Sequence, residues 1–202
     1  MNVGVLASGA GSNLQAILDR VHDKDAQVVA VASDKPGAQA LARAEAAGVA
    51  TATFPGAGYA TREERDLAMA SWLTQRGAEL VVLAGYMQLV TPAFLSAFPG
   101  RVINVHPALL PAFPGLQAIE QALAYGVKVF GVTVHFVDEG TDSGPVILQR
   151  AVELPGAVDP AAVREALRPH EHDLLTSAVA LIARGAVRPD PSHPRRILVE
   201  PS

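Results

Sequence analysis

The chain of 202 residues contains no cysteine, and this absence excludes several classes of protein. A disulfide framework, a thiolate zinc site, an iron–sulfur cluster and a thiol nucleophile all require cysteine. Aromatic residues make up only 5% of the chain, and no apolar run approaches the roughly 18 residues of a membrane-spanning helix. The N-terminus also lacks a basic region followed by an apolar one, so we expect no secretion signal.

An excess of basic residues is also missing. Lys and Arg total 16 against 20 Asp and Glu, the formal net charge is −4, and the basic residues form no cluster. Because a nucleic-acid-binding surface needs such a cluster, we expect neither nucleic acid nor membrane as a partner. Apolar residues, in contrast, make up 50% of the chain, which excludes intrinsic disorder. We therefore expect a globular protein of the cytoplasm.

Short β-rich runs alternate with longer amphipathic segments along the chain. This alternation is typical of a mostly parallel sheet whose strands are connected by helices. The predicted strands are 2–7, 27–33, 49–54, 79–84, 101–106, 127–137 and 146–154, and the predicted helices are 13–24, 37–47, 61–76, 92–97 and 116–125. The last two strands have no helical pattern between them, which predicts an antiparallel pair. The predicted fold class is α/β, with a Rossmann-like, mostly parallel sheet and an antiparallel strand in the C-terminal half.

The C-terminal part of the chain is predicted to form a helix and then an extension. The helix should run from about residue 160 to residue 184, and Pro169 should kink or split it because proline removes a backbone hydrogen bond. The proline-rich tail that follows is expected to pack loosely. We predict one domain over residues 1–185 and an extension over residues 186–202.

A glycine-rich loop, residues 8–13, connects the first predicted strand to the first predicted helix. Glycines allow the backbone to approach a ligand closely, and a helix N-terminus offers free N–H groups to an anion. A dinucleotide fingerprint would need glycine in place of Leu14, although Asp34 is suitably placed for a ribose-binding acid. We favour a single phosphate as the ligand. A dinucleotide and a purely structural turn remain as alternatives.

Two polar side chains, Asn104 and His106, lie near the end of an apolar strand. Residues two apart on a strand point to the same face, and ligands of open α/β sheets bind beyond the carboxyl ends of the strands. An imidazole acts as an acid or base near neutral pH, and an amide is a suitable donor to an oxyanion. The alternative interpretation is a buried pair whose polar atoms bond to neighbouring backbone.

An acidic loop, residues 138–145, follows an apolar strand and carries Asp138, Glu139 and Asp142. A carboxylate there would orient an imidazole and favour its cationic form. The sequence alone does not say which of the three meets His106, and the other two are expected to be solvated. We expect His135, on the preceding strand, to be an interior histidine rather than a catalytic one.

A run of His170, Glu171 and His172 invites a metal-site interpretation. Residues two apart on a helix point away from each other, however, so we expect no metal there. The chain also has no nucleophile-elbow motif and no kinase signature.

Four separated segments together resemble the phosphoribosylglycinamide formyltransferase family, over about residues 1–185. They are residues 9–16, residues 83–87, residues 104–111, and residues 134–137 together with 142–145. The family consists of folate-dependent enzymes of purine biosynthesis. The Asn-x-His and Asp residues are shared with other folate formyltransferases, including the methionyl-tRNA enzyme, and with formyltetrahydrofolate hydrolase.

The resemblance implies that the chain transfers the formyl group of 10-formyltetrahydrofolate to the amine of glycinamide ribonucleotide, N1-(5-phospho-D-ribosyl)glycinamide. It implies no metal, and a monomer or a homodimer. One alternative is a hydrolase that passes the formyl group to water, which the phosphate loop argues against. The other is a non-catalytic binder of phosphoribosyl ligands, which the intact Asn, His and Asp set argues against.

The resemblance also implies a role for individual residues. It implies that the catalytic residues are Asn104, His106 and Asp142. It implies that the phosphate is held by Gly11, Ser12 and Asn13, and the glycinamide by Glu171. It implies that the folate is held by Arg62, Met87, Gln88, Leu89 and Val90, with Asn104 touching the formyl group. Three positions depart from the family pattern. Gln88 replaces a frequent arginine, Ala108 replaces serine, and Pro169 lies close to Glu171.

Overall fold

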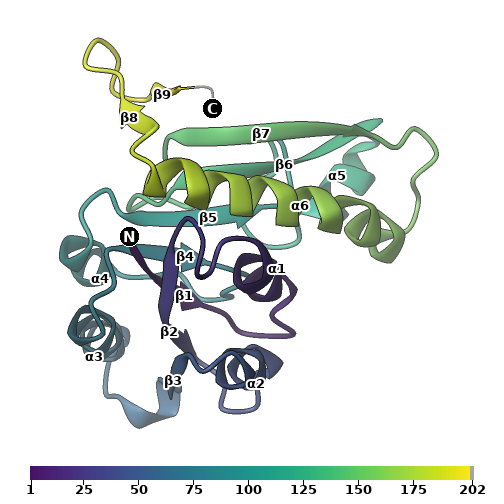
Figure 1. The fold of residues 1–202 in the computed structure, drawn as a ribbon. Coiled ribbons are helices and arrows are strands. Elements are labelled where there is room, and N and C mark those ends of the chain that lie inside the picture. Colours follow the sequence, from purple (N-terminus) through teal and green to yellow (C-terminus); the bar gives the residue numbers. More distant parts are fainter. Residues whose placement is uncertain (201–202) are drawn as a thin grey trace. The chain divides into compact units, whose positions relative to one another are not determined.

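The computed structural model describes residues 1–200 (Figure 1), and the chain divides into two compact units, Met1–Asn104 and a second unit from Val105 onward. Among the described residues, no helix is both long and apolar enough to span a bilayer.

The first unit contains a parallel sheet with the strand order β3-β2-β1-β4-β5. The strands are β1 (Asn2–Leu6), β2 (Gln27–Ser33), β3 (Ala50–Thr53), β4 (Leu80–Leu83) and β5 (Val102–His106), whose last two residues belong to the second unit. The helices are α1 (Ser12–Arg20), α2 (Gln39–Ala46), α3 (Arg62–Gln75) and α4 (Pro92–Ala97), with a short 3₁₀ turn, η1 (Gly56–Gly58).

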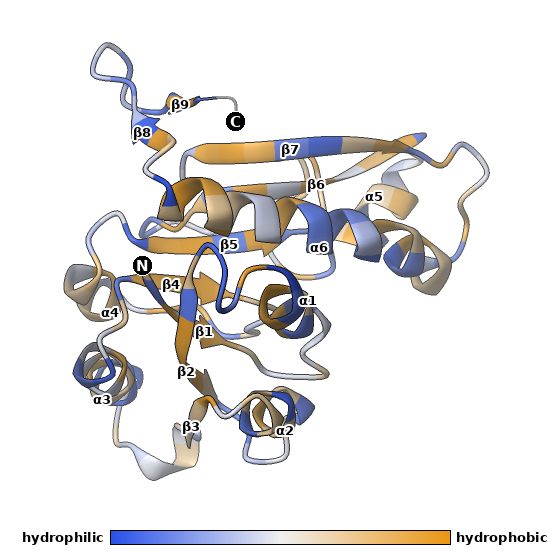
Figure 2. Ribbon diagram, viewed as in Figure 1, coloured by the Kyte–Doolittle hydropathy of each residue, from blue (hydrophilic) through white to orange (hydrophobic). Residues whose placement is uncertain are grey.

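The core of this unit lies around β1 and β4. Val5, Leu6, Val81 and Val82 are fully buried, and Figure 2 shows these strands as strongly hydrophobic. Such runs are expected of parallel strands covered on both faces. The chain leaves β1 toward β2 on one side and returns to β4 on the other, and ligands of open α/β sheets bind where the strand order changes direction in this way. A ligand site is therefore expected at the loops that follow β1 and β4.

The second unit contains an antiparallel pair, β6 (Val129–Phe136) and β7 (Val146–Glu153). Its helices are α5 (Ala118–Tyr125) and α6 (Pro160–Ala183), and α6 packs along both strands and against α5 (Figure 1). A small antiparallel hairpin, β8 (Val187–Pro189) and β9 (Ile197–Val199), follows α6. The parallel sheet and the antiparallel strands of the C-terminal half confirm the predicted fold class.

Two expectations about the C-terminal part change. Helix α6 continues through Pro169 and is therefore not split, whereas the expected kink remains a prediction. Leu167 and Leu175, on either side of the proline, are fully buried, so packing compensates for the lost hydrogen bond. The tail forms the β8–β9 hairpin rather than a loose segment. The boundary at residue 185 remains a prediction, and residues 201–202 of the expected extension lie outside the described residues.

Candidate active site

Gly11 directly precedes α1 and has a φ of +73°, in the left-handed region that favours glycine. A Cβ at this position would lie 2.8 Å from the Cα of Ala40 in α2, so a side chain has no room. The first turn of α1 has no side-chain cap and no acidic residue. The partial positive charge of a helix N-terminus suits an anion, and the assignment of Gly11, Ser12 and Asn13 to a phosphate stays a prediction.

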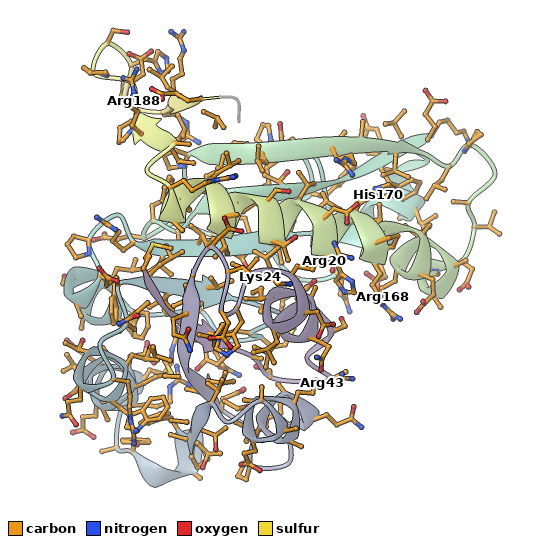
Figure 3. The ribbon with its side chains drawn as sticks, viewed as in Figure 1. Arg20, Lys24, Arg43, Arg168, His170 and Arg188 are labelled. Carbon is orange, nitrogen blue, oxygen red and sulfur yellow. The ribbon has the colours of Figure 1, made fainter. Side chains whose placement is uncertain are left out.

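Helix α2 holds this glycine loop from one side. The backbone N–H of Ala40 donates to the Gly9 carbonyl at 3.1 Å. Arg43, labelled in Figure 3, donates from Nε to the Ala10 carbonyl at 2.8 Å. These two bonds fix the loop against α2.

Ser8 connects the loops that follow β1 and β4. Its N–H donates to the Gly85 carbonyl at 3.1 Å, and its hydroxyl accepts from the Met87 N–H at 2.9 Å. The same hydroxyl donates to Asp34 Oδ1 at 2.6 Å. Asp34, considered above as a ribose-binding acid, thus stabilises the glycine loop.

The loop after β4 carries four of the five residues expected at the folate site. Met87 and Leu89 are 56% and 58% exposed, and the guanidinium of Arg62 in α3 donates to the Leu89 carbonyl at 2.9 Å. Gln88 is also exposed and Val90 is half-buried. Exposed apolar side chains on one short loop suit a ligand or partner with an apolar surface.

A buried ion pair in α3, which the sequence pattern did not indicate, holds the end of this loop. Arg65 donates to Asp66 Oδ1 from Nε at 2.9 Å, and the two residues are 3% and 0% exposed. The other oxygen of Asp66 accepts from the Thr91 N–H at 2.7 Å. Burial raises the pKa of the neighbouring Tyr86 phenol to about 12, although the charge of Arg65 opposes that shift.

In the second unit, His106 lies at the end of β5 and is 5% exposed. Its Nδ1 is 3.3 Å from Asp142 Oδ2, and its Nε2 is 2.8 Å from the Phe113 carbonyl oxygen. A carbonyl only accepts, and so does an ionised carboxylate. Nε2 therefore donates to the Phe113 carbonyl, and Nδ1 faces the Asp142 carboxylate.

Asp142 is the carboxylate of the acidic loop that meets His106. Its Oδ2 also accepts from the Gly115 N–H at 2.7 Å, and its Oδ1 is 3.6 Å from His135 Nε2. Burial alone would raise the pKa of this carboxyl group. The contacts with His135 and Gly115 and the charge of His106 outweigh burial and lower the pKa from 3.8 to about 2. Asp142 is therefore ionised at neutral pH.

In the part of the chain that the structure describes, neither of the other two loop carboxylates pairs with His106. Asp138 accepts from the Ser143 hydroxyl at 2.6 Å and from the Gly140 N–H at 3.1 Å, so it shapes the loop. Glu139 is exposed. His135 is an interior residue, as expected, but its contact with Asp142 was not foreseen.

The remaining expected site residues are Asn104 and Glu171. Asn104 shares one face of β5 with His106, because the two lie two residues apart on the strand. Glu171 is half-buried in α6. In the described part of the chain, no group of three or more acidic or histidine side chains is arranged to hold a metal ion.

Comparison with known proteins identifies the family. The profile of the formyl transferase family matches residues 1–179. The chain belongs to the formyl transferase family. The phosphoribosylglycinamide formyltransferase of Mycobacterium tuberculosis is 45% identical over 184 residues, which cover 91% of this chain and 85% of that protein. The Bacillus subtilis protein of the same name is 40% identical over 177 residues, covering 87% and 91%.

A longer relative and a solved structure agree with this assignment. The trifunctional purine biosynthetic protein adenosine-3 of Chironomus tentans is 38% identical over 92% of this chain, but the chain spans only 14% of that protein. The crystal structure of glycinamide ribonucleotide transformylase 1 from Symbiobacterium toebii is 44% identical, with a TM-score of 0.94 over 98% of this chain and 93% of that one. These comparisons confirm the resemblance inferred from the sequence, and the chain is an enzyme of the formyltransferase class.

Proposed function

We propose that this chain transfers the formyl group of 10-formyltetrahydrofolate to the amine of glycinamide ribonucleotide, giving formylglycinamide ribonucleotide in purine biosynthesis. The observation that carries the proposal is the pairing of the His106 ring with an ionised Asp142, in a formyl transferase chain. The names of the relatives support the choice of acceptor.

In the proposed mechanism the substrate amine attacks the formyl carbon and forms a C–N bond, which leaves a negatively charged tetrahedral oxygen. Asn104 and His106 stabilise this oxyanion, because they share one face of β5. Collapse of the intermediate breaks the bond between the formyl carbon and N10 of the folate. The proton lost by the amine reaches N10 through His106 or a water molecule.

The contacts of His106 suggest which ring nitrogen does this work. Nδ1 faces Asp142, which holds and charges the ring, so Nε2 is the nitrogen left for the oxyanion. In this structure Nε2 contacts the Phe113 carbonyl. We propose that the oxyanion replaces this carbonyl, which exchanges a neutral acceptor for a charged one.

Substrate binding is assigned in the same way. The glycine loop and α1 would hold the phosphate through Gly11, Ser12 and Asn13. Arg62, Met87, Gln88, Leu89 and Val90 would hold the folate, with Asn104 touching its formyl group, and Glu171 would hold the glycinamide. These assignments follow the family pattern.

The decisive assay follows release of tetrahydrofolate from 10-formyltetrahydrofolate by absorbance, with and without glycinamide ribonucleotide. Release that requires the ribonucleotide supports the transferase. Release without it identifies the hydrolase, and no release in either case contradicts both activities and leaves a phosphoribosyl binder.

Variants test the residue roles in the same assay. Asn104→Ala should lower kcat by roughly 10²–10³-fold, the usual cost of one oxyanion donor. Asp142→Asn should also lower kcat strongly, because it removes the charge that holds His106. Glu139→Gln is the matched control, since Glu139 is an exposed carboxylate of the same loop. Full turnover in folded Asn104→Ala would contradict the assigned role.

We also propose that the enzyme works in the cytoplasm as a monomer or homodimer, without nucleic acid or membrane. Both substrates are water-soluble anions, which suits this compartment. Analytical ultracentrifugation of the purified chain tests the assembly state.

A further inference from the structure

The turn between β8 and β9, residues 190–196, is stabilised from within. Asp190 accepts from the Ser192 N–H and hydroxyl at 2.8 and 2.7 Å, and the Arg196 guanidinium is 3.1 Å from its other oxygen. The bond from the Ser192 hydroxyl is the main cause of a lowered pKa at Asp190. An aspartate that accepts from the backbone two residues on is a common way to build a turn. The conformation of the turn is therefore set by the hairpin itself.

Arg195, next to Arg196, makes its contact outside the hairpin. Its guanidinium donates to the carbonyl of Ser143 at 2.6 Å. The other arginines of the segment pair within it, Arg196 with Asp190 and Arg188 (labelled in Figure 3) with Glu200. Strand β9 also lies against β7, which begins three residues after Ser143. The hairpin is thus anchored beside the acidic loop.

Asp142, in the acidic loop, has an uncommon backbone conformation and a carboxylate with several partners. Asp142, directly before Ser143, has a φ of +50°, which is uncommon for any residue other than glycine. Its carboxylate must meet both the Gly115 N–H and the His106 ring. One side of the loop is held by Asp138, through Ser143 and Gly140. The Ser143 carbonyl accepts a further bond from outside the loop, from Arg195.

We propose that Arg195 is a positioning residue that fixes the acidic loop, so that Asp142 stays in contact with His106. The C-terminal hairpin then stabilises the active-site loop through this one contact. This inference rests on the proposed function, because it gives the loop a catalytic role. Arg195 acts through Ser143 and Asp142.

The kinetic test compares two neighbouring arginines. Arg195→Gln removes the bond to the loop, and Arg196→Gln removes only an ion pair inside the hairpin. We expect Arg195→Gln to lower kcat by about tenfold, in keeping with the loss of one charge-assisted hydrogen bond. The KM for glycinamide ribonucleotide should not change, because its phosphate is held elsewhere. Arg195→Lys should recover most of the rate, and Arg196→Gln should stay within about twofold of the parent, since exposed pairs contribute little.

A second readout does not depend on activity. The Gly115 amide donates to Asp142, so its hydrogen exchange, followed by NMR, reports whether the carboxylate is in place. We expect about tenfold faster exchange in Arg195→Gln, by the same hydrogen-bond estimate, and no change in Arg196→Gln.

The outcomes separate the two proposals. The proposed role of Arg195 is overturned if kcat and the Gly115 exchange rate are both unchanged in Arg195→Gln. It is also overturned if Arg195→Gln and Arg196→Gln change these two quantities equally. If the parent enzyme transfers no formyl group, the proposed function fails, but the Gly115 exchange still decides whether Arg195 positions Asp142. If Arg195→Gln does not fold, the same comparison is made with Arg195→Met, which also lacks the donor; a kcat and a Gly115 exchange rate equal to those of the parent would overturn the inference.

Discussion

Replacement of Gly11 by alanine should damage both the stability of the protein and its anion site. Gly11 has a φ of +73°, and its Cβ would lie 2.8 Å from both the Cα and the Cβ of Ala40. Gly48 has almost the same φ, +72°, but a Cβ there would meet no atom within 4 Å. The two alanine variants therefore share the backbone strain and differ in the steric clash.

The size of each effect follows from this geometry. A left-handed conformation costs an L-residue about 1–2 kcal/mol, and this cost applies to both Gly11→Ala and Gly48→Ala. Forcing one extra carbon into a packed site adds about 1–3 kcal/mol, and this cost applies to Gly11→Ala alone. For a chain of this size each kcal/mol lowers Tm by about 2–4 °C. We expect Tm to fall by about 5 °C in Gly48→Ala and about 10 °C in Gly11→Ala.

Two measurements on each variant test the reasoning. Thermal unfolding followed by circular dichroism gives the two Tm values, and isothermal titration gives the affinity for glycinamide ribonucleotide. We expect weaker binding only in Gly11→Ala, because the clash displaces the loop that precedes α1. Equal losses of Tm in the two variants would refute the steric argument. Unchanged ribonucleotide affinity in folded Gly11→Ala would refute the assignment of the loop to the phosphate.

Two further predictions concern the buried charges. Because the pKa of Asp142 is lowered to about 2 from 3.8, its ionised form stabilises the fold above pH 3.8, by about 2 kcal/mol, and this is lost as the pH falls toward 2. Urea unfolding should show Asp142→Asn less stable than the parent at pH 7, with the gap closing in acid; a gap that is constant with pH would contradict this. Asp66→Ala should cost about 3–5 kcal/mol because it leaves Arg65 charged and buried, whereas Glu120→Gln, which breaks an exposed pair with Arg164, should cost less than about 1 kcal/mol. Similar urea midpoints for these last two variants would contradict the assigned burial.

The parallel half of the fold was predictable because its signals are local. Buried strands such as β4 appear as uninterrupted apolar runs, and the glycine loop appears between a strand and a helix. The polar pair on β5 was predictable for the same reason, since a spacing of two places both side chains on one face. None of these inferences needs a contact between distant residues.

Features that depend on distant contacts were missed or left open. Arg65 and Asp66 lie in a charged run, Arg62–Asp66, that resembles a solvated helix face, and only the tertiary packing of α3 shows that two of its members are buried. The continuity of α6 through Pro169 likewise depends on leucines packed around the proline. The turn of the hairpin in the tail is stabilised by the bonds of Asp190 with Ser192. These bonds are short-range, but the turn is hard to recognise in a segment rich in proline.

The choice among the three loop carboxylates shows why geometry was needed to complete the site. Asp138 and Asp142 both lie in a loop rich in turn-forming residues, and no pattern distinguishes a structural aspartate from a catalytic one. The structure distinguishes them by their partners: a hydroxyl and an N–H of the loop itself for Asp138, and an N–H and two imidazoles from outside the loop for Asp142. An isolated carboxylate in this position would be driven toward its neutral form by burial. Because its partners keep it charged, Asp142 can hold His106 as a cation, and the proposed stabilisation of an oxyanion requires that charge.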